Sequence, residues 1–232
     1  MKRLDIIQSF KFKLDRASLE RFHHAFVRPI LEYGDVVWSD AHDCDLVKLD
    51  RVQLRALRIV TGATERSNIN HLYEDTGWHT LSERCDLHKL SWFYKMINDM
   101  VPRYLSALVP GTVLDRTNYN LRSSQNISTS HGRKECYNRS FLPSTINLWN
   151  CLSIEVRESP THDVFVRRLK NMNKRPERPW YSAGARFPNI HLARMRIGCS
   201  MLNAHLYSNL FVADSPRCSR GAEYENTEHY FL

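Results

Sequence analysis

Residues 80–100 read TLSERCDLHKLSWFYKMINDM, and their pattern predicts one long helix with a buried face. Thr80 and Glu83 have the spacing of a capping box, in which a hydroxyl and a carboxylate satisfy the first backbone N–H groups of a helix. The apolar residues recur with the 3.6-residue period of one buried helix face: Leu81, Cys85, Leu90, Phe93, Tyr94, Ile97 and Met100. Pro102 is expected to end this helix.

The same period continues on both sides and predicts a mainly α fold. Further helices are expected over residues 16–33, 44–61, 68–76, 161–173 and 189–209. Pro29 should kink the first of these near Arg28, because proline lacks a backbone N–H. Gly62 and Gly77 stand where C-caps are expected for the second and third.

Composition divides the chain into five expected regions. They are a helical region (1–110), a polar loop with room for a short hairpin (111–139), a second apolar region (140–173), a basic linker with prolines (174–188) and a C-terminal region (189–232). The loop is expected because Asn, Ser, Thr and Arg dominate there and the apolar period is lost.

The basic charge of the chain is concentrated in one segment. The 232 residues carry a net charge of +8, and residues 164–196 hold nine basic residues against one acidic residue, Glu177. Such a segment suits nucleic acid, and two aromatic residues inside it could stack on bases. The candidates are Arg167, Arg168, Lys170, Lys174, Arg175, Arg178, Trp180 and Tyr181. The alternative is a solvated linker whose aromatic residues pack on a neighbouring domain.

A second basic group lies on the helix expected over 44–61. Lys48, Arg51, Arg55 and Arg58 are spaced by three, four and three residues, which places them along one side of a helix. This stripe of four basic residues could present cations to a phosphate backbone. The alternative is an ordinary solvated helix face, partly neutralised by Asp45 and Asp50.

Catalytic signatures are missing from the sequence. The chain has no Asp-Asp pair, no Tyr-x-Asp-Asp, no Walker loop and no G-x-S-x-G. We therefore expect no enzyme activity, no catalytic residues and no cofactor. No apolar run approaches membrane-spanning length and no secretion signal is recognisable, so neither a membrane partner nor a disulfide framework is expected.

Near the C-terminus, Cys218 and His229 look like half of a zinc site. A closed zinc site needs about four thiolate or imidazole ligands. We expect these two residues to be remnants of a degenerate Cys/His knuckle and predict no metal site.

Several longer segments, in the same order along the chain, resemble the region that follows the catalytic palm of LINE-type, non-LTR retrotransposon reverse transcriptases. They include Arg28-Pro29-Ile30-Leu31-Glu32-Tyr33-Gly34 with Val37-Trp38, Leu49-Asp50-Arg51-Val52-Gln53, Gly77-Trp78, Ser140-Phe141-Leu142-Pro143 and Leu148-Trp149-Asn150. The tail resembles the family too, through Arg194-Met195-Arg196-Ile197-Gly198, His205-Leu206 and Ser215-Pro216 with Cys218.

The resemblance implies that residues 1–110 form a thumb-like region, that 140–173 form the region after the thumb, and that the chain binds RNA or DNA through the phosphate backbone. Two departures matter. Arg220 stands where the family's knuckle has its second cysteine, and the last cysteine would lie beyond Leu232. The palm and its carboxylates are absent from the chain.

We therefore expect a non-catalytic C-terminal fragment of such a reverse transcriptase. Two alternatives stay open: a co-opted RNA- or DNA-binding module, and a helical protein-interaction domain. The sequence leaves the oligomeric state, the cellular compartment and the choice between RNA and DNA undecided.

Overall fold

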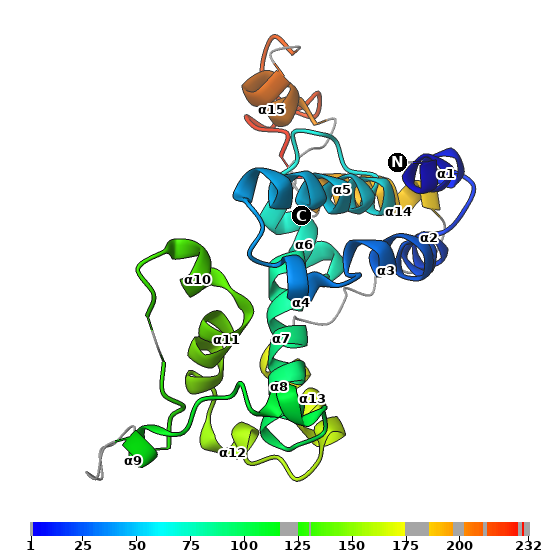
Figure 1. Ribbon diagram of the computed structural model, residues 1–232. Helices are drawn as coiled ribbons and strands as arrows, with labels where there is room; N and C mark the ends of the chain where they lie inside the picture. The colour runs from blue at the N-terminus through cyan, green and yellow to red at the C-terminus, as the bar shows by residue number, and fades with distance from the viewer. Residues whose placement is uncertain are drawn as a thin grey trace. The chain divides into compact units, whose positions relative to one another are not determined.

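The computed structural model describes residues 2–116, 125–129, 131–174, 186–196, 202–210, 213–226 and 229. Over these residues the chain is mainly α-helical, which confirms the predicted fold class (Figure 1). In the same residues, extended backbone pairs only at an antiparallel bridge between Thr112 and Ile127. No helix in the described part combines the length and apolar character needed to cross a membrane.

The chain divides into two compact units that alternate along the sequence. Unit 1 comprises Met1–Leu31, Val47–His79 and Arg175–Leu232, and unit 2 comprises Glu32–Leu46 and Thr80–Lys174.

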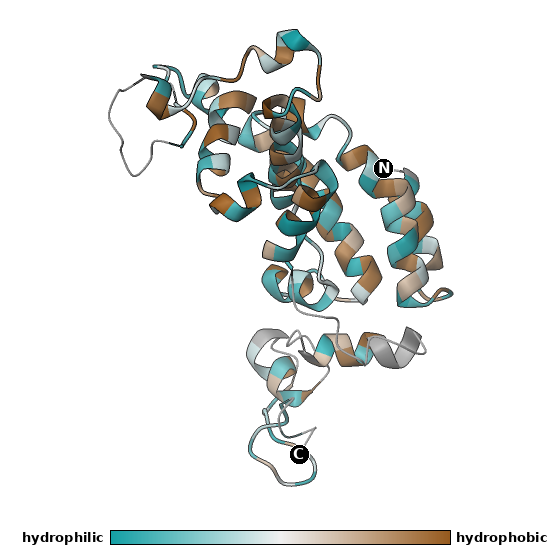
Figure 2. Cartoon of the chain, turned by 90° about the horizontal axis from the view of Figure 1, so that it is seen from below, coloured by the Kyte–Doolittle hydropathy of each residue, from teal (hydrophilic) through white to brown (hydrophobic). Residues whose placement is uncertain are grey.

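Unit 1 is built from short helices around one long one. They are α1 (Lys2–Phe10), α2 (Arg16–Phe22), the π-helix η1 (His23–Val27), α3 (Arg28–Leu31), α5 (Asp43–Thr61, whose first turn belongs to unit 2), α6 (Ile69–Thr76), α14 (Arg186–Arg196), α15 (Asn203–His205) and the π-helix η3 (Leu206–Leu210). Most helices carry apolar and polar residues on different sides, as the colours of Figure 2 show.

Near Arg28, where Pro29 was expected to disturb the helix, the structure has a widened turn. The backbone N–H of Arg28 bonds to the carbonyl of His23, five residues earlier, so the chain follows π-helix geometry immediately before the proline. Insertion of such a turn is a known response to a break in the regular helical hydrogen bonds.

The predicted ends of α5 and α6 are also confirmed. Gly62 and Gly77 adopt φ of +76° and +67°, the left-handed region that glycine enters without a steric penalty. Their N–H groups bond to the carbonyls of Arg58 and Tyr73, both at 2.8 Å. These caps hold the last turn of each helix.

A buried ion network lies inside unit 1. The guanidinium of Arg16 contacts Glu20 Oε1 at 3.0 Å and Asp75 Oδ2 at 2.8 Å, and it donates to the Asp75 carbonyl at 2.7 Å. All three side chains are almost fully buried. The network therefore joins α2 to the end of α6.

Unit 2 is organised around α7 (Leu81–Ile97). The other helices are α4 (Asp35–Trp38), α8 (Arg103–Ser106), α9 (Val113–Arg116), α10 (Glu135–Arg139), α11 (Phe141–Asn150), α12 (Ile154–Arg157) and α13 (His162–Met172). The capping box is confirmed, because Thr80 Oγ1 accepts from the Glu83 N–H at 3.1 Å while Glu83 Oε2 accepts from the Thr80 N–H at 2.9 Å.

Aromatic rings from α7, α11 and α13 form the core of unit 2. Tyr94 and Phe165 stack with centroids 4.5 Å apart, and Phe93 meets the edge of Trp149 at 5.4 Å. The Tyr94 hydroxyl donates to the Ser159 carbonyl at 2.6 Å, which satisfies its polar end inside the core.

Several helix boundaries differ from the sequence prediction. The helix expected to reach Pro102 ends at Ile97, because Asp99 adopts a left-handed φ of 52° and the Met100 N–H bonds back to Lys95 at 2.9 Å. The single helix expected over 189–209 is interrupted, because Leu202 is extended immediately before α15. Helix α1 was not predicted, and the segment expected as a polar loop, 111–139, contains α9 and α10.

Candidate nucleic-acid interface

The four predicted residues Lys48, Arg51, Arg55 and Arg58 all lie on α5, as expected, and together form the α5 stripe. Lys48, Arg51 and Arg55 are exposed and Arg58 is half-buried, whereas Val52, Ala56 and other residues between them are buried.

Asp43 and Asp45 occupy the first turn of α5, where the helix dipole favours negative charge. The Arg139 guanidinium bonded to Asp43 at 2.6 Å holds the pKa of that carboxyl below its usual range.

Arg55 and Arg58 make side-chain hydrogen bonds within unit 1. Arg55 donates to Asp5 Oδ1 at 2.8 Å and to Gln8 Oε1 at 2.6 Å, and Arg58 donates to the Glu65 carbonyl at 3.1 Å. The Arg55–Asp5 pair is solvent-exposed, so it contributes little to stability and is weak enough to exchange for another anion.

The second half of the stripe borders a basic cavity, which we define by its cationic lining residues Lys11, Arg55, Arg58 and Arg194. It has a volume of about 310 Å³ and lies between the end of α1, the end of α5 and α14. The lining includes one acidic residue, Glu65, and one exposed aromatic residue, Phe12. Positive charge therefore predominates in this concave part of unit 1.

Gly62 fixes the wall of the basic cavity. Its carbonyl accepts from Arg194 Nε at 2.9 Å. A Cβ atom at Gly62 would lie 2.6 Å from Ile190 Cγ1, closer than packed carbon atoms tolerate. Glycine therefore permits both the left-handed cap of α5 and the close approach of α14.

Arg58 has unused hydrogen-bonding capacity at this cavity. Its Nε atom is buried and makes no hydrogen bond with any residue that the structure describes. A guanidinium has five N–H donors, and a buried unsatisfied donor is costly. An anion accepting from Arg58 after a small movement of the side chain would relieve that cost.

The sequence missed two members of this cavity. Lys11 carried no local signal, and Arg194 was noticed only in the basic segment 164–196 and in the tail that resembles the family. No spacing rule links either residue to α5, because Gly62 and Arg194 are 132 positions apart in the chain. Only the tertiary fold brings them together.

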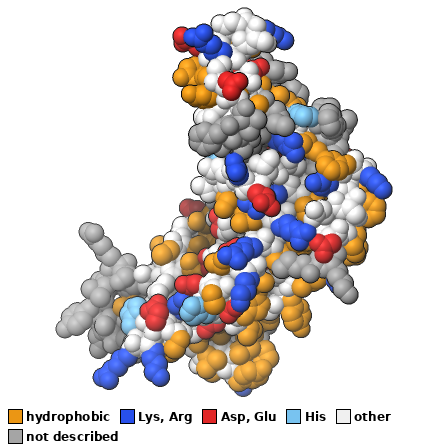
Figure 3. All heavy atoms as spheres, turned by 90° about the horizontal axis from the view of Figure 1, so that it is seen from above, with side chains coloured by type: hydrophobic (Ala, Val, Ile, Leu, Met, Phe, Trp, Pro, Cys, Tyr) orange, Lys and Arg blue, Asp and Glu red, His pale blue; other side chains and the backbone are white. Residues whose placement is uncertain are grey.

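The second predicted patch lies on and after α13. Arg167, Lys170 and Lys174 are exposed, whereas Arg168 donates to the Glu155 carbonyl and to Ser159 Oγ. The remaining candidates, Arg175, Arg178, Trp180 and Tyr181, lie outside the described residues. On the face drawn in Figure 3, basic and acidic side chains are interspersed, so that face is not uniformly basic.

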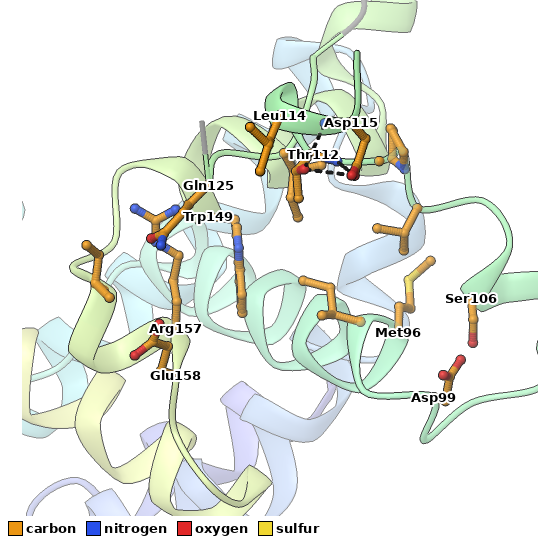
Figure 4. A pocket seen from close by; sticks show the side chains of 16 residues that line it. Met96, Asp99, Ser106, Thr112, Leu114, Asp115, Gln125, Trp149, Arg157 and Glu158 are labelled. Atoms are coloured by element: carbon orange, nitrogen blue, oxygen red, sulfur yellow. Dashed lines mark hydrogen bonds between the residues drawn. The ribbon is translucent and has the colours of Figure 1, made fainter. Parts of the chain in front are cut away.

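Unit 2 contains a larger cavity of about 520 Å³ with a different character (Figure 4). Its walls include Met96 and Trp149, and its carboxylates, Asp99, Asp115 and Glu158, outnumber its one arginine, Arg157. Arg157 is held by the Leu152 carbonyl at 3.0 Å and by Asn126 Oδ1 at 2.9 Å. The excess of carboxylates makes this cavity a poor phosphate site.

The C-terminal knuckle remnants do not form a metal site in the described residues. Cys218 is buried, and its sulfur accepts from the Arg220 N–H at 3.4 Å. The backbone N–H of His229 bonds to Asn226 Oδ1 at 2.9 Å. Within the described part of the chain, no three His, Cys, Asp or Glu side chains are placed to share a metal ion.

Among the cysteines that the structure describes, the buried Cys85 has a clearly perturbed acidity. Burial raises the pKa of its thiol to about 11, so it is protonated near neutral pH and is a poor nucleophile. His88 contacts Asp35 at 2.5 Å beside it, but the raised pKa of the thiol disfavours an activated Cys–His pair.

Comparison with known proteins gives no match: no family model, no curated protein and no solved structure is significantly similar to this chain.

Proposed function

We propose that the chain is a non-catalytic, nucleic-acid-binding region of a LINE-type reverse transcriptase, and that unit 1 contacts the phosphate backbone. The observation that carries the proposal is the basic cavity at the end of the α5 stripe, where cations from α5 and α14 and from the turn after α1 converge. Guanidinium groups are well suited to phosphate because their donors match its oxygen atoms.

The exposed half of the stripe supports the same proposal. Lys48 and Arg51 point away from the buried side of α5 and precede the cavity along the helix. A helix with this arrangement can rest on a core and meet a strand of phosphates along its length. Such contacts fix the position of nucleic acid without reading its sequence.

The family assignment rests on the sequence resemblance alone. An open reading frame that continues upstream into a palm with Tyr-x-Asp-Asp would support it. A frame that continues into an unrelated domain would contradict it.

A protein-interaction domain remains the second candidate, favoured by exposed apolar residues on and before α4. Tyr33 and Val37 are each more than four-fifths exposed. Exposed apolar surface of this kind is common where two proteins make contact.

Fluorescence anisotropy with a labelled oligonucleotide at low salt separates these functions. The proposal predicts binding by the parent chain and weaker binding by a Lys48→Gln/Arg51→Gln variant, in which both substitutions are at exposed positions. The matched control is Arg133→Gln/Lys134→Gln, which removes the same charge from two exposed positions that belong to neither predicted basic patch and should leave binding nearly unchanged. Absence of binding by the parent chain would overturn the proposal.

The non-catalytic part of the proposal has its own test. Primer extension by the purified chain, supplied with magnesium or manganese, is expected to yield no incorporation. Template-dependent incorporation would contradict it.

A further inference from the structure

An exposed aromatic ring borders the basic cavity. Phe12 lies in the turn after α1, lines the cavity and is 67% exposed. Lys11 Nζ lies 4.6 Å from the centre of its ring, a cation–π distance. Single exposed apolar side chains are common on protein surfaces, so the feature that distinguishes Phe12 is its place at a basic cavity and not its exposure alone.

The cavity and the ring have complementary chemistry for one nucleotide. Arg58 and Arg194 line the cavity and can donate hydrogen bonds to a phosphate. Phe12 offers an apolar face suited to a base. The volume of about 310 Å³ is at the low end for small-ligand sites, which suits a single nucleotide unit and not a long segment of strand.

We propose that the basic cavity is a site for an unpaired nucleotide of a nucleic-acid strand, with its phosphate on Arg58 and Arg194 and its base stacked on Phe12. This inference rests on the proposed function, and it adds a preference for single strands. In a duplex both faces of each internal base are covered by neighbouring pairs, so Phe12 can stack only on an unpaired or terminal base.

The ring is the feature that distinguishes this site from general charge attraction. Phosphate contacts alone would treat single strands, duplexes and abasic strands similarly at equal charge density. A stacking contact is lost when the base is absent, and base–aromatic stacking changes affinity by about 5- to 140-fold per base.

The experiment compares three labelled probes by fluorescence anisotropy at low salt: a short oligothymidylate, the same strand annealed to oligoadenylate, and an abasic strand of equal length. The proposal predicts that the parent chain binds the oligothymidylate at least about fivefold more tightly than the abasic strand, and more tightly than the duplex.

Phe12→Leu keeps an apolar side chain but removes the aromatic face, and its high exposure makes a folding defect unexpected. This variant should bind the oligothymidylate and the abasic strand, which carry the same backbone charge, with similar affinity. The matched control is Phe10→Leu, which makes the same change in α1 at a residue that does not line the cavity, and it should keep the parent's preference. Circular dichroism verifies that both variants are folded.

The outcomes separate the two proposals. Equal binding of the oligothymidylate and the abasic strand by the parent chain, or an unchanged preference between them in Phe12→Leu, would overturn the nucleotide site and leave backbone binding intact. Failure of the parent chain to bind any probe would overturn both.

Discussion

Arg194 Nε donates to the carbonyl oxygen of Gly62 at 2.9 Å and thereby ties α14 to the end of α5. The same glycine has a φ of +76° and leaves no room for a Cβ atom against Ile190. One residue thus sets the end of the basic helix and the position of the helix that closes the basic cavity.

Gly62→Ala should therefore destabilise the chain more than a glycine replacement that costs backbone strain alone. Gly34 is the matched control, because its φ is +67° and a Cβ there would meet only Trp38 Cδ1 at 3.9 Å. We expect Gly34→Ala to lower the free energy of unfolding by about 1 kcal/mol and Gly62→Ala to lower it by about 2–3 kcal/mol. Urea denaturation measures both, and equal losses would contradict the steric role of Ile190.

The buried Arg16 network should be sensitive to loss of its cation. Arg16→Met leaves Glu20 and Asp75 buried without their shared guanidinium, and we expect the free energy of unfolding to fall by about 3–5 kcal/mol. Arg139→Met removes the exposed pair with Asp43 and should lower the free energy of unfolding far less, because solvent screens an exposed ion pair. Similar losses in the two variants, measured by thermal or urea unfolding, would show that burial of the network is unimportant.

The capping box of α7 gives a smaller and more local prediction. Thr80→Ala removes the acceptor of the Glu83 N–H and should lower the free energy of unfolding by about 0.5–2 kcal/mol. Thr80→Ser keeps the hydroxyl and should retain most of that stability. If serine and alanine were equivalent in chemical denaturation, the cap would not be stabilising α7.

The free energy of unfolding should depend on His162 as the pH falls below neutral. Burial, with a smaller effect from the positive charge of Lys95, lowers the pKa of this histidine below its ordinary value of 6.5, while Asp163 acts in the opposite direction. Its Nε2 lies 2.8 Å from Ser91 Oγ. Between the lowered pKa and 6.5 the unfolded chain binds more protons than the folded chain, so stability falls as the pH decreases through this window.

His162→Gln removes that proton uptake. The stability difference between the parent chain and the variant should therefore shrink as the pH falls from about 7 to about 5. Urea denaturation at several pH values measures the difference. A difference that stays constant across this range would contradict the assignment.

The sequence predicted the features that depend on neighbouring residues. Thr80 and Glu83, the two C-cap glycines and Pro29 each act within one or two helical turns, so their spacing is sufficient to place them. The early end of α7 was missed because Asp99, a residue without a strong bias, adopts the left-handed conformation that ends the helix.

The candidate site could be predicted only in part for a related reason. The periodicity of α5 placed Arg55 and Arg58 on one side of a helix, but it gave no information about what packs beside them. Lys11 and Arg194 join them through tertiary contacts, and Arg55 turned out to be paired with Asp5. Such contacts between distant segments have no signature in a single sequence.

The most direct test of backbone binding is the salt dependence of affinity for duplex DNA. Each neutralised phosphate releases counterions, so the logarithm of the binding constant should fall with the logarithm of salt concentration by about 0.9 per contact. Arg51→Gln/Arg55→Gln/Arg58→Gln should flatten that slope by about two to three units, because it removes up to three phosphate contacts. An Arg167→Gln/Arg168→Gln/Lys170→Gln variant measures the contribution of the α13 patch in the same titration. No binding by the parent chain at low salt, or an unchanged slope in the α5 variant, would contradict the assignment of the α5 stripe as the phosphate-binding surface.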